Sequence, residues 1–174
     1  RPVVTPSDLS GIKLRTPRGI WRVKLFQAFG ANPTPMPLSE VFVALQTGVM
    51  DGQENPLAQI HASKFQEVQT YLSLTGHVYT PAYVTVGASW DRLPEDVRAT
   101  LQRIASENQS FVHETATQMD ADFLVELREA GVEVNQPDRD AFIRASTEIF
   151  EEFGSTVEGG EAMVADALSL VDGA

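Results

Sequence analysis

Two closely spaced arginines, Arg15 and Arg18, are the residues of this sequence best suited to bind an anion. They lie where the alternating stretch 12–15, typical of a half-buried strand, meets Thr16-Pro17, a pair typical of a helix start. Ligands often bind at such strand ends, and a guanidinium can hold a carboxylate through two parallel hydrogen bonds. The stretch therefore predicts a carboxylate site. The alternative at this point is that both arginines are solvated surface charges.

A second polar cluster, Asp51 to Pro56, repeats this arrangement, because Asn55-Pro56 again combines a cap residue with a proline suited to a helix start. Asn55 is either a cap or a ligand contact, and its amide carries donors and acceptors enough for both. Asp51 and Glu54 are the kind of carboxylates that bind divalent metals, but no supporting ligand pattern accompanies them.

Reactive groups for catalysis are scarce. The chain has no cysteine, its three histidines (His61, His77 and His113) show no metal-ligand spacing, and it lacks a nucleophile elbow, a Walker loop and a dinucleotide fingerprint. What remains is charge recognition, which favours a binding protein without cofactor or metal over an enzyme. The competing hypothesis is a small enzyme that uses Asp51 and Glu54 with a divalent metal.

The composition is that of an ordinary globular protein. Of the chain's residues, 43% are hydrophobic and 21% are charged. A length of 174 residues is enough for one hydrophobic core or two small lobes. A formal net charge of −11 argues against nucleic acid as a partner, because phosphate binding needs a basic surface. No apolar run has transmembrane length, so we expect no direct membrane insertion. The first residue is not methionine, and we expect a processed or truncated chain.

The elements that would hold these residues follow from the hydrophobic periods and the turn residues. We expect a strand at 12–15, helices at 17–29 and from Ser39, an irregular proline-rich stretch at 31–37, a helix at 57–69, strands at 71–75, 83–88 and 132–134, and helices from about 95, from about 138 and at 161–171. The helix from about 95 meets no Gly or Pro before Gly131 and would span about 50 Å. It either bridges two lobes or breaks near 118–122. Leu38, just before the helix expected from Ser39, either staples that helix or lines a cleft.

Several motifs together resemble the DctP-type extracytoplasmic substrate-binding proteins of TRAP (tripartite ATP-independent periplasmic) transporters. The motifs are Asp8 to Pro17, Gly30 to Met36, Ser39 to Pro56, Trp90 to Glu95 and Gly131 to Val134. The resemblance implies an α/β, two-lobed, periplasmic-binding-protein type II-like fold with hinge strands and a long bridging helix. Family members are longer, so the first lobe would be largely absent from this chain. Residues 1–80 and 121–174 would form most of the second lobe, and 81–120 would belong to the first.

The resemblance also implies roles for individual residues. Arg15 would clamp the ligand carboxylate, Asn55 would hydrogen-bond the ligand, and Leu38 would pack on it. Arg18 stands where sialic-acid-binding relatives carry a polar amide, which disfavours sialic acid and favours a second acidic group or a smaller hydroxylated acid. Pro17, in the same stretch, completes the expected ligand-binding set.

The function implied by the resemblance is capture of an organic acid, such as a C4-dicarboxylate or a sugar acid, in an interlobe cleft. The protein would be periplasmic and would deliver its ligand to the membrane subunits of a TRAP permease. The alternative is a ligand-sensing or interaction module that uses the same fold without transport.

Overall fold

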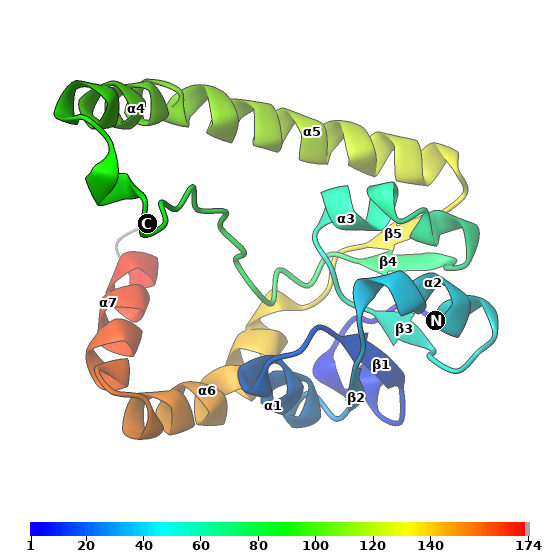
Figure 1. Cartoon of the computed structure of the whole chain (residues 1–174). Coiled ribbons are helices and arrows are strands. Elements are labelled where there is room, and N and C mark those ends of the chain that lie inside the picture. Colours follow the sequence, from blue (N-terminus) through cyan, green and yellow to red (C-terminus); the bar gives the residue numbers. More distant parts are fainter. Residues whose placement is uncertain (173–174) are drawn as a thin grey trace.

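The computed structural model of this protein describes residues 1–172, so the last two residues of the range 121–174 lie outside it. Helices and short parallel strands alternate along the chain (Figure 1). The strands are β1 (Lys13–Thr16), β2 (Asn32–Pro35), β3 (Gly52–Gln53), β4 (Tyr71–Ser73) and β5 (Glu133–Asn135). The α-helices are α1 (Ile20–Ala28), α2 (Leu38–Gln46), α3 (Leu57–Ala62), α4 (Glu95–Glu107), α5 (Gln109–Glu129), α6 (Arg139–Thr156) and α7 (Gly160–Asp172). Short 3-10 helices span Pro6–Leu9, Phe65–Glu67 and Trp90–Arg92.

The strands form two separate parallel sheets. One has the order β2-β1-β3, and the other consists of β4 and β5. Helices α1 and α6 lie on one side of the strands, and α2, α3 and α5 lie on the other (Figure 1). This mixture of parallel strands and covering helices confirms the expected α/β class.

Each side of the strands has its own hydrophobic core. The first cluster lies on the side of α1 and α6. It consists of Leu9, Leu14, Phe26, Phe29, Ala31 and Phe142. The second joins α2, α3 and α5 and consists of Val41, Ala44, Leu45, Met50, Ile60, Phe65, Leu127 and Val132. The buried side chains of α2 are those that the helical spacing predicts. Alternation along β1 places Leu14 in the first core, so the neighbouring Arg15 side chain points to the opposite side.

The start of α1 differs from the prediction. Thr16 is the last residue of β1 instead of a helix cap, because its carbonyl accepts the Met36 N–H at 3.0 Å and its side chain is fully buried. The helix therefore begins only at Ile20. Pro17 and Arg18 lie in the connection before it, so Arg18 is not in the first helical turn.

The proline-rich stretch expected to be irregular instead contains strand β2. The Asn32 N–H donates to the carbonyl of Ile12, just before β1, at 2.8 Å, and the Met36 N–H donates to Thr16 at 3.0 Å. The register pairs Pro33 with Leu14 and Pro35 with Thr16. Main-chain groups alternate between the two edges of a strand, so both prolines place their missing N–H on the outer edge. An edge strand tolerates proline at every second residue, and the prediction overlooked this.

Two further helix boundaries were predicted wrongly. Helix α2 begins at Leu38, with Pro37 instead of Ser39 at its N-cap position. Helix α3 has Pro56 at its N-cap position and ends at Ala62, where the backbone turns and Lys64 adopts a left-handed conformation with φ of 56°. The helix expected over 57–69 is thus divided into α3 and a 3-10 turn.

The middle of the chain is poorly packed. Residues 83–88 are not a strand, although their composition favours one, and Val84 is 95% exposed. The long helix breaks at Asn108, between α4 and α5, and 118–122 is regular helix within α5. We find no helix among residues 1–172 whose length and apolar content would let it span a bilayer.

Candidate functional site

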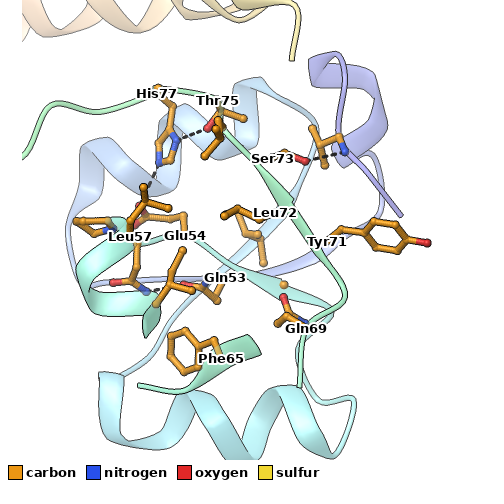
Figure 2. A pocket seen from close by; sticks show the side chains of 18 of the residues that line it. Gln53, Glu54, Leu57, Phe65, Gln69, Tyr71, Leu72, Ser73, Thr75 and His77 are labelled. Carbon is orange, nitrogen blue, oxygen red and sulfur yellow. Dashed lines mark hydrogen bonds and ion pairs between the residues drawn. The ribbon is translucent and has the colours of Figure 1, made fainter. Parts of the chain in front are cut away.

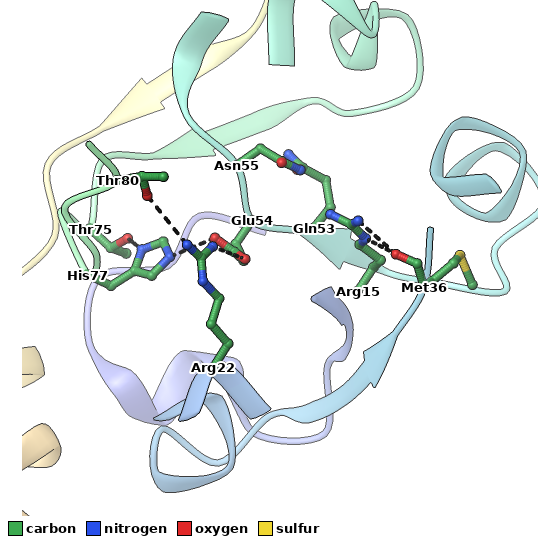
Figure 3. A network of polar contacts seen from close by, with 9 residues as sticks. All are labelled: Arg15, Arg22, Met36, Gln53, Glu54, Asn55, Thr75, His77 and Thr80. Carbon is green, nitrogen blue, oxygen red and sulfur yellow. Dashed lines mark hydrogen bonds and ion pairs between the residues drawn. The ribbon is translucent and has the colours of Figure 1, made fainter. Parts of the chain in front are cut away.

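Arg15 is the centre of the candidate site. It lies near the carboxyl end of β1, is only 3% exposed, and donates from Nε and Nη2 to the Met36 carbonyl oxygen at 2.9 and 2.7 Å (Figure 3). The buried Nη1 has no hydrogen-bond partner among the described residues. A buried, unsatisfied donor is costly, which makes this nitrogen a candidate position for an acceptor. Arg15 is therefore not the solvated surface charge of the alternative interpretation.

An amide pair lies beside this guanidinium. Gln53 on β3 is the register partner of Arg15, and its Oε1 accepts from Asn55 Nδ2 at 2.6 Å (Figure 3). Asn55 is half-buried and makes no side-chain cap on α3. This bond fixes the orientation of the Asn55 amide while leaving its carbonyl oxygen for another donor. Arg15, Gln53 and Asn55 together form what we call the clamp.

The remaining predicted ligand residues lie in different environments. Pro17 is half-buried and Arg18 is exposed, both in the connection between β1 and α1. Leu38 is partly buried and packs on the α2 core, as does Met36. The packing of Leu38 agrees with a structural role. Its contact with a ligand, like those of Pro17 and Arg18, stays a prediction.

A charged network that the sequence did not reveal lies next to the clamp. Glu54 is 7% exposed and accepts from Arg22 Nη1 at 2.6 Å, and its other oxygen lies 3.1 Å from His77 Nε2 (Figure 3). The His77 ring is in turn 2.6 Å from Thr75 Oγ1 and packs edge-on against Phe26. The network links α1, the end of β3 and the segment that follows β4.

Burial and hydrogen bonding determine the charge of this region. Burial alone would raise the pKa of Glu54. The hydrogen bonds and charges of His77 and Arg22 lower it by more than burial raises it, so the pKa lies below its usual value. Burial also lowers the pKa of Arg15, a change that the nearby Glu54 carboxylate opposes. An arginine pKa starts so high that Arg15 keeps its charge.

The two carboxylates considered for a metal serve separate contacts. Glu54 is engaged by Arg22 and His77, and the Asp51 carboxylate accepts the Lys13 backbone N–H at 2.9 Å. No cluster of three or more metal-binding side chains occurs among the described residues. Sequence spacing gave no signal for Arg22, because it reaches Glu54 across 32 positions.

Comparison with known proteins places the chain in a family. It belongs to the DctP family of bacterial extracellular solute-binding proteins, family 7, whose profile matches residues 1–156. Among its relatives, the 2,3-diketo-L-gulonate-binding periplasmic protein of Escherichia coli K12 is 37% identical over 98% of this chain and 52% of its own. The C4-dicarboxylate-binding periplasmic protein of Rhodobacter capsulatus is 32% identical over 95% of this chain and 50% of its own.

Solved structures agree with this assignment. A TRAP periplasmic solute-binding protein from Polaromonas sp. JS666, bound to D-erythronate, superposes with a TM-score of 0.87 at 34% identity, over 95% of this chain and 55% of that one. The fold is therefore that of TRAP solute-binding proteins. The chain spans about half the length of the relatives that it matches.

Proposed function

We propose that the protein to which this chain belongs is a periplasmic solute-binding protein that captures an organic acid and delivers it to a TRAP permease. It would act by binding and not by catalysis. The buried Nη1 of Arg15 supports this proposal most directly, because it belongs to a charged group held by a backbone carbonyl and has no partner within residues 1–172.

The ligand carboxylate would accept from Arg15 Nη1, and its hydroxyl groups would donate to the Asn55 carbonyl oxygen. A charge-assisted hydrogen bond in a buried site is stronger than one in water. Leu38 and Pro17 would contact the apolar side of the ligand, and Arg18 would attract it or hold a second acidic group. Since relatives bind diketogulonate, C4-dicarboxylate and erythronate, we propose a small hydroxylated or dicarboxylic acid.

The rest of the site would come from a second lobe. In this proposal residues 1–80 and 121–174 form most of one lobe, and 81–120 belongs to the other, with the ligand between them. Closure of the two lobes would exclude water from the clamp, and the closed form would be the one that the permease recognises.

A thermal-shift screen of organic acids on the full-length protein tests this function. A ligand at 100 times its dissociation constant should add about 2.7 kcal/mol to the free energy of unfolding. D-Erythronate and C4-dicarboxylates are the first compounds to test. We expect Arg15→Ala to abolish the shift, because the substitution removes the charged donor.

The matched control is Arg103→Ala, which removes an exposed arginine on α4 and should leave the ligand shift unchanged. Arg18→Ala removes the charge proposed to attract the acid but keeps Arg15. It should reduce the thermal shift without abolishing it. A full response in Arg15→Ala would show that the clamp assignment is wrong.

A further inference from the structure

His77 is a titratable residue next to the clamp that ligand binding, as proposed above, leaves without a direct role. Its side chain is only 15% exposed, and its ring packs edge-on against Phe26 with the two ring centroids 5.0 Å apart. Together with Thr75, Glu54 and Asn55 it lines a cavity of about 470 Å³ (Figure 2). A polar cavity of this size has room for water, so the ring can exchange protons with solvent.

Both nitrogens of the His77 ring have polar partners that suit either protonation state. Nε2 lies 3.1 Å from Glu54 Oε2, and Nδ1 lies 2.6 Å from Thr75 Oγ1 (Figure 2). In the neutral ring, Nε2 donates to the carboxylate and Nδ1 accepts from the Thr75 hydroxyl. In the charged ring both nitrogens donate, because a hydroxyl can also accept. The ring can therefore gain or lose a proton without losing a hydrogen bond.

The charged groups that face His77 come from two other elements. Glu54, at the end of β3, is the direct partner, and Arg22 on α1 pairs with the other oxygen of the same carboxylate at 2.6 Å. Lys24, the second cation of α1, instead pairs with a carboxylate of α6. Residues 74–80, the segment that carries the ring, contain no other group that is charged at neutral pH. The charge of the ring is therefore felt mainly within this network.

A ligand anion at the clamp would change the charge balance of the network. Arg15 lies close enough to Glu54 and Arg22 for both of their charges to affect its pKa. In the free site, a protonated His77 is the third cation around one carboxylate. An acid anion bound to Arg15 supplies a second negative charge, so the third cation becomes less costly.

We propose that capture of the organic acid at the clamp is coupled to the uptake of a proton by His77. This inference rests on the proposed function, because the clamp must hold the acid. Linkage is reciprocal: if the bound acid favours the protonated ring, protonation raises the affinity for the acid by the same factor. Histidine is the side chain that ordinarily changes its charge between about pH 5 and pH 8. The affinity should therefore rise as the pH falls through this range.

Calorimetric titration of the full-length protein with D-erythronate tests the coupling. The dissociation constant should be about fivefold lower at pH 5.5 than at pH 8. The carboxyl group of the ligand is ionised at both values, so its own titration does not cause the change. Titrations near the middle of this range, in two buffers with different heats of ionisation, should show net proton uptake on binding.

His77→Gln keeps a donor for Glu54 but cannot take up a proton. In this variant the dissociation constant should change by less than about twofold over the same range, and proton uptake should disappear. The matched control is His113→Gln, at an exposed position of α5, which should keep the full pH dependence. Proton uptake by the unaltered protein tests the coupling even if His77→Gln does not fold.

The outcomes separate this inference from the proposed function. If D-erythronate and the other acids of the thermal-shift screen bind at no pH, the proposed function fails and the inference fails with it. If an acid binds with the same affinity at both pH values and without proton uptake, only the inference is overturned. It is also overturned if the pH dependence persists in His77→Gln.

Discussion

Residues 1–77 and 121–146 form a packed body, whereas the middle of the chain is an exposed arm. In the body, Val41 and Phe65 are 0% exposed and Leu127 is 1% exposed. In the arm, residues 78–120, no residue is buried, and Phe111 is 65% exposed. The apolar residues of the arm have helical spacing, so they form a face that its own segment cannot cover.

This difference separates two kinds of sequence information. In the body, a residue and the residues that bury it are both present, so pattern and packing agree. In the arm, the apolar residues have helical spacing, but none of residues 1–172 buries them. The experiments below use this contrast, beginning with the largest expected effect.

Core truncation should distinguish the two regions most strongly. We expect Phe65→Ala to lower the free energy of unfolding of the 174-residue chain by about 3–5 kcal/mol, because it leaves a cavity. Phe111→Ala should change it by no more than about 0.5 kcal/mol. Urea denaturation measures both. In the full-length protein the loss for Phe111→Ala should grow, and equal losses for the two residues in the short chain would contradict the comparison.

The buried charge network of the body should respond more than an ion pair of the arm. Arg22→Met leaves Glu54 buried with only His77 and should cost about 3 kcal/mol. The double variant Arg22→Met/Glu54→Gln should recover part of this loss, because it no longer contains the buried Glu54 carboxylate. Arg103→Met, which breaks the exposed pair with Glu107, should cost less than about 0.5 kcal/mol. Chemical denaturation of all three variants checks the order.

The same network predicts a pH dependence. The folded pKa of Glu54 lies below its ordinary value of 4.5, so the pairing stabilises the fold fully above that pH and is lost as the pH falls towards the folded pKa. Between about pH 5 and pH 3, the free energy of unfolding should therefore fall more steeply in the unaltered chain than in Glu54→Gln. Glu129→Gln, at an exposed position, is the control and should follow the unaltered chain. Parallel curves for Glu54→Gln and the unaltered chain would contradict the ion pairing.

The smallest effect concerns a helix cap of the body. Asp138 accepts the Ala141 N–H at 3.0 Å and caps α6. Asp138→Ala should cost about 1 kcal/mol, and Asp138→Asn, which keeps an acceptor, should cost less. Asp140→Ala, in the same turn but without the cap bond, serves as the comparison in thermal denaturation.

Local patterns predicted much of the body. Alternation placed Leu14 inside, helical spacing identified Val41 and Phe142 as buried, and glycine marked the turn into β5 at Gly131. These features depend on neighbours a few residues away. The position of Arg15 at a strand end could be predicted for the same reason.

The contacts of the site could not be predicted in this way. Arg15 is held by a backbone carbonyl, and any residue type at position 36 would supply one. Glu54 was considered as a metal ligand. Its actual partners, Arg22 and His77, are brought to it only by the fold, so nothing in the sequence indicated them. The strand expected at 83–88 has the right composition, but a strand forms only where another strand is there to pair with it.

The spacing of the prolines in β2 has a consequence for how copies of this protein behave in solution. Pro33 and Pro35 leave the outer edge of β2 without N–H donors at these two positions. A strand of another molecule therefore cannot form a regular set of backbone hydrogen bonds with this edge. Proline thus acts as a gatekeeper against intermolecular sheet growth at a place where the chain would otherwise be prone to aggregation.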